Sequence, residues 1–135
     1  MNRTRCLFVL LVVFLVFAAC GSKNASDGTT DKAADSSLSD PKGSIAYQFD
    51  LLKAGDTDKL KSCFTERQRE RITKERVDKA KEKVGQLTLD DLVASTEMGE
   101  YEGKKTAKIK MKNGRTLTTL ILTDGKWLSD TVWFD

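Results

Sequence analysis

The chain has 135 residues, enough for one domain with a tail. Its 23 Lys and Arg nearly balance its 20 Asp and Glu, which argues against a nucleic-acid-binding protein. The chain has no histidine, which excludes a Ser-His-Asp triad, a Cys-His nucleophile pair and a histidine-rich zinc site. No catalytic, metal-binding or cofactor-binding motif stands in the sequence, so we expect no metal and no cofactor.

The first nineteen residues have the composition of a secretory signal. Arg3 and Arg5 precede an uncharged, mostly apolar run over residues 6–19, which ends in small residues. Fourteen residues of helix span about 21 Å, well short of the roughly 30 Å of bilayer hydrocarbon. The segment is therefore predicted to be cleaved rather than to remain as a membrane span.

The residues around the expected cleavage point are Phe17, Ala18, Ala19 and Cys20. They resemble the lipobox of bacterial lipoproteins, with phenylalanine where leucine is usual. The resemblance implies cleavage between Ala19 and Cys20, diacylglycerol on the Cys20 thiol and a membrane partner held through that anchor. The alternative is an ordinary signal peptide followed by a chance cysteine. Gly21 follows the cysteine, and in a diderm source the resemblance then implies the outer membrane. In other sources it implies the outer face of the cell membrane.

Residues 20–40 are expected to be a lipidated, disordered tether, and residues 41–135 an α+β domain. Among residues 21–40, Leu38 is the one large aliphatic residue, so the segment can bury little apolar surface. Without the leader and the lipidated cysteine, Cys63 is the remaining thiol and cannot form a disulfide within the chain. It is either a small buried apolar residue or a reactive thiol.

Three helices are expected to open the domain. Asp40 can cap a helix that starts at Pro41 and ends at Gly55. Its apolar face carries Ile45, Phe49 and Leu52 at helical spacing. Asp56 can cap a short second helix. A third helix is predicted over residues 66–84, with a capping box from Thr65 to Gln68, a break near Thr73 and an end at Gly85.

The predicted third helix is dense in charges of both signs. Glu70 with Lys74, and Glu75 with Lys79, stand four residues apart, as ion pairs on a helix do. One interpretation is a solvated helix face stabilised by ion pairs. The other is a basic ridge that meets anionic lipid headgroups or an acidic partner.

From residue 87 onward the apolar pattern alternates, which predicts strands. The first strand is expected from Leu87, with a bulge around Asp90 and Asp91, up to a turn over residues 101–104. Asn113-Gly114 and Asp124-Gly125 predict two further hairpin turns, with the last strand over residues 126–134. The expected fold is α+β, with three N-terminal helices packed on a curved four-stranded antiparallel sheet.

Two short motifs join this order of elements. Leu52-Lys53-Ala54-Gly55-Asp56 closes the first helix, and Thr123-Asp124-Gly125-Lys126-Trp127 opens the last strand. Residues 41–135 thus look like the small bacterial lipoproteins with a nuclear-transport-factor-2-like, cystatin-like α+β domain. That resemblance implies a cone-shaped pocket between the helices and the bent sheet, used for catalysis in some members and for binding or dimerisation in others.

The candidate pocket or contact residues are Tyr47, Asp50, Trp127, Asp130 and Trp133. The expected function is a non-catalytic module that binds a small apolar molecule or another envelope protein. The alternative is a ketosteroid-isomerase-like enzyme, for which the resemblance implies an Asp base facing a Tyr donor in an apolar cavity. A structural homodimer formed through the outer sheet face is a third possibility.

Overall fold

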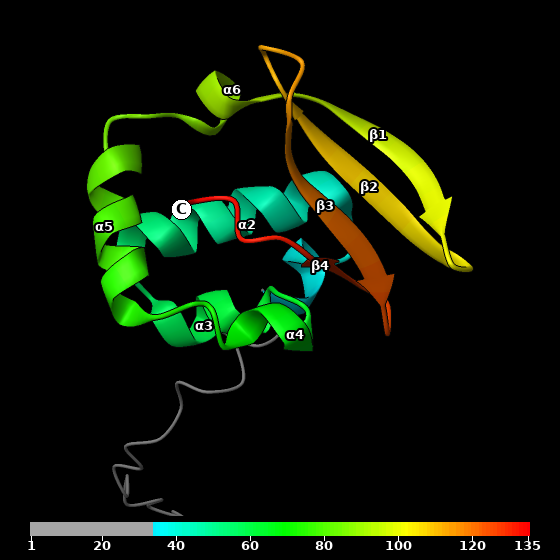
Figure 1. Ribbon diagram of the computed structural model, residues 1–135, viewed down its shortest axis with the longest axis horizontal. Helices are drawn as coiled ribbons and strands as arrows, with labels where there is room; N and C mark the ends of the chain where they lie inside the picture. Colours follow the sequence, from blue (N-terminus) through cyan, green and yellow to red (C-terminus); the bar gives the residue numbers. More distant parts are fainter. Residues whose placement is uncertain (1–33) are drawn as a thin grey trace, which may run out of the picture.

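The computed structural model describes residues 34–135 as an α+β fold with a four-stranded antiparallel sheet and several helices (Figure 1). The expected leader, the cleavage site at Ala19 and Cys20, and the tether up to residue 33 lie outside the described residues. No helix within residues 34–135 is both long and apolar enough to cross a bilayer.

The described chain begins with a turn of helix over residues 34–37, inside the expected tether. Leu38 is only 3% exposed and packs in the helical core. Its carbonyl oxygen accepts a hydrogen bond of 2.8 Å from the backbone N–H of Trp127, and Asp35 forms an ion pair of 2.6 Å with Lys126. The packed part of the domain therefore begins before Pro41, because Leu38, the one large aliphatic residue of the expected tether, is buried against the helices.

The first two helices follow the sequence prediction. Helix α2, Pro41–Ala54, is capped by the Asp40 carboxylate, which accepts from two backbone N–H groups of the first turn. Gly55 ends it in the left-handed conformation with φ of 78°, which glycine adopts without strain. Asp56 then caps helix α3, Thr57–Ser62.

The predicted third helix is two helices, α4 (Glu66–Arg69) and α5 (Lys74–Val84). The break lies where it was expected, and the Thr73 hydroxyl caps α5 by accepting from the backbone N–H of Arg76. Between the two helices the chain turns so that Ile72 is buried in the core. The capping box expected from Thr65 does not form, since its side chain bonds elsewhere.

The expected start of the first strand is wrong, because residues 89–92 form the short helix α6, Leu89–Leu92. The Asp91 carboxylate accepts at 2.7 Å from both the backbone N–H and the hydroxyl of Thr88. This capping box gives the two donors of Thr88 an acceptor within the helix, so they need no neighbouring strand. The first strand, β1, is Val93–Tyr101.

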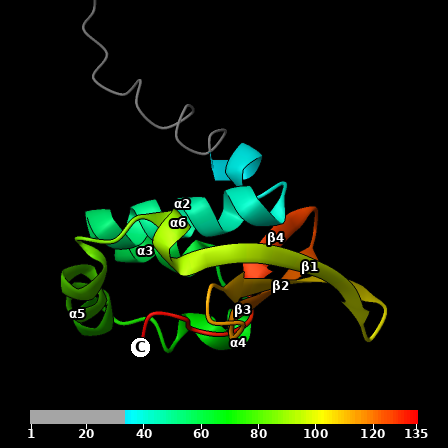
Figure 2. The same cartoon turned by 90° about the horizontal axis from the view of Figure 1, so that it is seen from above.

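The sheet is an antiparallel meander in the order β1-β2-β3-β4, with β2 at Lys104–Met111, β3 at Thr116–Thr123 and β4 at Lys126–Ser129. All three predicted turns are present. Figure 2 shows the sheet lying between α2 on one side and α4 on the other, while the far end of the β1–β2 hairpin projects away from the helices.

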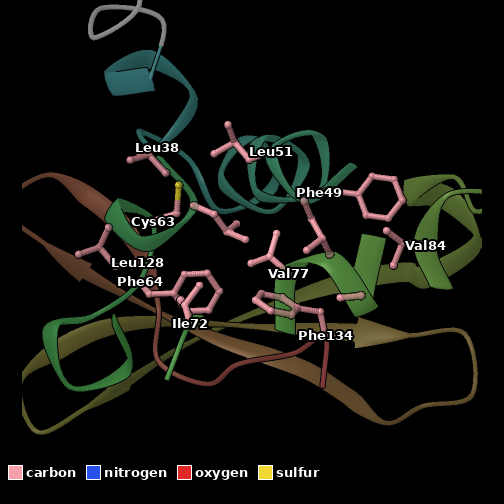
Figure 3. Close-up of a cluster of buried hydrophobic side chains, with 13 residues drawn as sticks. Leu38, Phe49, Leu51, Cys63, Phe64, Ile72, Val77, Val84, Leu128 and Phe134 are labelled. Atoms are coloured by element: carbon pink, nitrogen blue, oxygen red, sulfur yellow. The ribbon is translucent and has the colours of Figure 1, made fainter. Parts of the chain in front are cut away.

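The buried apolar residues form two clusters. One joins the helices to Leu128 and Phe134 and includes Cys63 (Figure 3). The other joins Ile45 of α2 to one face of the sheet, where Ala107 and Leu120 are fully buried.

The predicted last strand was too long. β4 ends at Ser129, whose N–H donates to the Cys63 carbonyl and whose carbonyl accepts from the Thr65 N–H. The chain then bends, which carries Phe134 into the helical core.

Candidate functional site

A cleft of about 1170 Å³, open to solvent, lies between α4 and one face of the sheet. The sheet side is formed by residues that pair across strands and so share a face: Tyr101 with Lys104, Ile121 with Leu128, and Thr123 with Lys126. The opposite wall comes from the start of α4, with Arg67 and its neighbours. The cleft therefore joins apolar groups from the sheet to a rim of charged side chains.

Asp130 lines this cleft and connects the end of β4 to the start of α4. Its carboxylate accepts from the Thr65 hydroxyl at 2.8 Å and from Arg67 Nε at 2.8 Å, and Arg67 Nη2 donates to its second oxygen. The Asp130 side chain is 13% exposed and the Arg67 side chain 69%. The hydrogen bond and the negative charge of Asp130 raise the pKa of Arg67. Both oxygens of the Asp130 carboxylate are thus engaged in a bidentate pair.

Tyr47 and Asp50 lie on α2, and neither lines the cleft. Asp50 is exposed, whereas Tyr47 is partly buried against the helical core. The two residues are not brought together with Asp130. The Asp and Tyr pair that the isomerase-like alternative implies is therefore not assembled from these three candidates.

The predicted last strand over residues 126–134 contains both tryptophans, but β4 ends at Ser129 and the bend after it separates them. Trp127 is buried between the sheet and α2. Trp133 stacks on Phe49 with ring centroids 6.4 Å apart, and its indole N–H donates to Gln48 Oε1 at 3.0 Å. Neither tryptophan lines the cleft; both are packing residues at the junction of helix and sheet.

Gln48 is the centre of a buried polar network between α2 and β4. The Ser129 hydroxyl donates to its Oε1 at 2.8 Å, and its Nε2 donates to the Ser44 hydroxyl at 3.1 Å. The Ser44 hydroxyl in turn donates to the Trp127 carbonyl at 2.6 Å. In residues 34–135 the buried polar side chains are Ser, Thr and Gln, so none of them carries a charge.

Cys63 is fully buried, and burial raises the pKa of its thiol to about 12. Its Sγ lies 3.4 Å from the Lys59 carbonyl oxygen. At neutral pH the group is a protonated thiol packed in the core. Of the two interpretations left open by the sequence, the structure favours the small apolar residue.

The charged helix α5 forms the ion pairs that a solvated face needs. Lys74 bonds Asp78 at 2.6 Å and Lys79 bonds Glu75 at 2.7 Å, all four side chains being largely exposed. Two of the five cations of α5 thus pair with acids of the same helix, Lys74 with Asp78 rather than with Glu70, which supports the solvated-face interpretation over the basic ridge.

Residues 34–135 hold no group of three or more Cys, Asp or Glu side chains that could bind a metal ion.

No family model, no curated protein and no solved structure matches this chain.

Sequence reasoning found Asp130 but missed Thr65, Arg67 and Gln48. Thr65 was assigned to a helix cap, and Arg67 is one of many basic residues in its segment. The one available signal was Gln48 itself, a polar residue one position before Phe49 and three after Ile45 on a helix with an apolar face.

Proposed function

We propose that this protein is a membrane-anchored bacterial lipoprotein whose exported domain is a non-catalytic binding or accessory module of the cell envelope. The cleft between α4 and the sheet is its binding site, and the ligand is a segment of another envelope protein. The domain is a nuclear-transport-factor-2-like variant in this proposal, on the strength of the Gly55-Asp56 junction and the hairpin that opens β4.

The observation that carries the proposal is the make-up of the cleft. Its volume of about 1170 Å³ exceeds the roughly 300–1,000 Å³ typical of small-molecule pockets, and it is open rather than enclosed. Apolar groups from Ile121 and Tyr101 lie beside charges of both signs, such as Glu70 and Lys104. Apolar surface combined with charged and polar groups is typical of surfaces that bind polypeptides.

No contact among the described residues favours catalysis. Among the carboxylates that line the cleft, Asp130 is engaged by Arg67 and Thr65. Binding is therefore the one function that we propose.

Site-specific photo-cross-linking in native membranes tests the cleft. A photoreactive amino acid at Thr123 lies in the cleft, whereas the same group at Lys112 lies exposed outside it. We expect one protein adduct from position 123 and none from position 112. Equal adducts from both positions, or a small apolar molecule in place of a protein, would contradict the proposed partner.

Fractionation tests the anchor separately. Cys20→Ser removes the thiol that would carry diacylglycerol, and we expect the variant protein to leave the membrane fraction. Wild-type and Cys63→Ser proteins serve as references, since Cys63 is buried in the core. A Cys20→Ser protein still found in the pellet after a carbonate wash would refute lipid anchoring.

A further inference from the structure

The two edge strands of the sheet, β4 and β1, differ in how far the rest of the chain covers them. The edge at β4 is short and covered: the Trp127 N–H donates to the Leu38 carbonyl at 2.8 Å, and the Ser129 N–H donates to the Cys63 carbonyl at 2.9 Å. Phe64 also forms an isolated parallel bridge with Ser129. Backbone donors at this edge are thus satisfied by the chain itself.

The edge at β1 is long and open. β1 has nine residues and pairs only with β2, so its other side faces no strand of residues 34–135. Seven of its nine residues are exposed, Val93 and Thr96 being partly buried. Figures 1 and 2 show β1 as the outer strand of the sheet, with no helix across its free side. Such an edge is a template for another strand.

The register shows which backbone groups point outward. The β1–β2 turn is the two-residue Glu102-Gly103, with positive φ at both positions, and Tyr101 pairs with Lys104 beside it. In a two-residue hairpin the flanking pair exchanges hydrogen bonds, and the direction alternates along the strand. The N–H and C=O of Thr96, Met98 and Glu100 therefore face away from β2.

The strand β1 carries two acidic side chains, Glu97 and Glu100, and no basic one. Residues 84–103 contain five Asp or Glu and no Lys or Arg. The Glu97 side chain is 60% exposed, forms an ion pair of 3.5 Å with Lys110 and lies opposite Lys108 in the register. Glu100 lies opposite Lys105 in the register and is exposed. A second copy of this chain would bring the same acidic edge against itself, so the charge favours a basic partner.

We propose that β1 binds an extended, lysine- or arginine-bearing segment of a partner protein, which adds as a fifth, antiparallel strand. Glu97 and Glu100 are three positions apart and lie on opposite faces of the sheet. The segment therefore carries two cations three positions apart, one opposite each glutamate. Met98 is 61% exposed and lies on the same face as Glu100. In an antiparallel segment the residue opposite Met98 directly precedes the cation opposite Glu97, so we expect that residue to be apolar. Backbone pairing supplies affinity and the charges supply specificity.

Amide hydrogen exchange on the full-length protein in detergent micelles tests the proposal. The probe is an eight-residue peptide with lysines three positions apart and valine before the second lysine; glutamates replace the lysines in its control. At a concentration about ten times its Kd, the lysine peptide should slow exchange at Thr96, Met98 and Glu100 about tenfold. The glutamate peptide should leave these amides unchanged.

Charge reversal supplies the matched variants. Glu97→Lys combined with Glu100→Lys should bind the glutamate peptide and lose the lysine peptide. Glu75→Lys with Glu82→Lys changes the net charge equally on the exposed face of α5 and should keep the wild-type preference. Because all four positions are exposed, we expect each variant to fold.

Three results would overturn the proposal: no protection by the lysine peptide, equal protection by both peptides, or protection that grows with protein concentration alone. The last result would mean that a second copy occupies the edge. The two tests can fail separately, because Thr123 lines the cleft whereas Met98 does not.

Discussion

The buried amide of Gln48 offers the sharpest test of how this fold is held together. The side chain is fully buried between α2 and β4. Its Oε1 accepts from the Ser129 hydroxyl at 2.8 Å and from the Trp133 indole N–H at 3.0 Å, and its Nε2 donates to Ser44 at 3.1 Å. One side chain thus links the helix to the last strand and to the segment that follows it.

Gln48→Leu keeps the approximate volume and removes both the acceptor and the donor. The Ser129 hydroxyl then loses its acceptor in a buried site and the Trp133 N–H in a partly buried one, while Ser44 keeps its bond of 2.6 Å to the Trp127 carbonyl. An unsatisfied buried donor costs about 1–3 kcal/mol, and the partly buried Trp133 N–H costs less than a fully buried one, so we expect the free energy of unfolding to fall by roughly 2–5 kcal/mol. For a domain near 100 residues, about 3 kcal/mol corresponds to a fall in Tm of roughly 12–24 °C.

Gln68→Leu is the matched control. Gln68 is also buried, but the one hydrogen bond to its Oε1 is a marginal 3.4 Å from Arg71. We expect its free energy of unfolding to change by less than about 1 kcal/mol. Urea denaturation followed by circular dichroism and by tryptophan fluorescence gives both values. Equal losses in the two variants, or a more stable Gln48→Leu protein, would refute the assigned role of the network.

Three further predictions concern single residues. The raised pKa of Cys63 keeps its thiol protonated, so a thiol reagent at pH 8 should label it only on unfolding. The free energy of unfolding should fall as pH rises from about 9 towards 12, because the thiol then ionises only in the unfolded chain. The hydrogen bonds from Thr88 lower the pKa of Asp91, so acid releases this cap only below the ordinary carboxyl range; Thr88→Val should raise that pKa in an NMR titration. Glu102 has φ of 51°, so Glu102→Asn should stabilise the turn by roughly 0.5–1 kcal/mol in thermal melts, whereas no gain would contradict the strain.

The candidate site was only partly predictable from the sequence. Asp130 was named as a candidate pocket residue, and the structure places it in the lining of the cleft, but its partner Arg67 lies 63 residues earlier in the chain. Nothing local distinguishes Arg67 from the other cations of its segment. Long-range pairs of this kind depend on how α4 packs against the end of β4, and periodicity in the sequence does not report that packing.

Short-range chemistry determined much of the fold by itself. Asp40 and Gly55 set the ends of α2, Thr73 set the break before α5, and the Gly-containing turns set the meander, because each acts through its own backbone or that of close neighbours. Tertiary structure decided the remainder. Residues 89–92 were expected in a bulged strand yet form a helix, because Leu89 and Leu92, three positions apart, both pack on the core and Thr88 and Asp91 cap the turn.

The end of β4 was likewise decided by distant residues. Val132 and Trp133 have strand-like character, but Ser129 is bonded by Cys63 and Thr65, and burial of Phe134 among the helices draws the chain away from the sheet. The free energy that an apolar side chain gains on burial depends on the area removed from water and not on which surface covers it. The sequence therefore indicates that these side chains are buried, but not where. Which surface covers them depends on the complete arrangement of helices and strands.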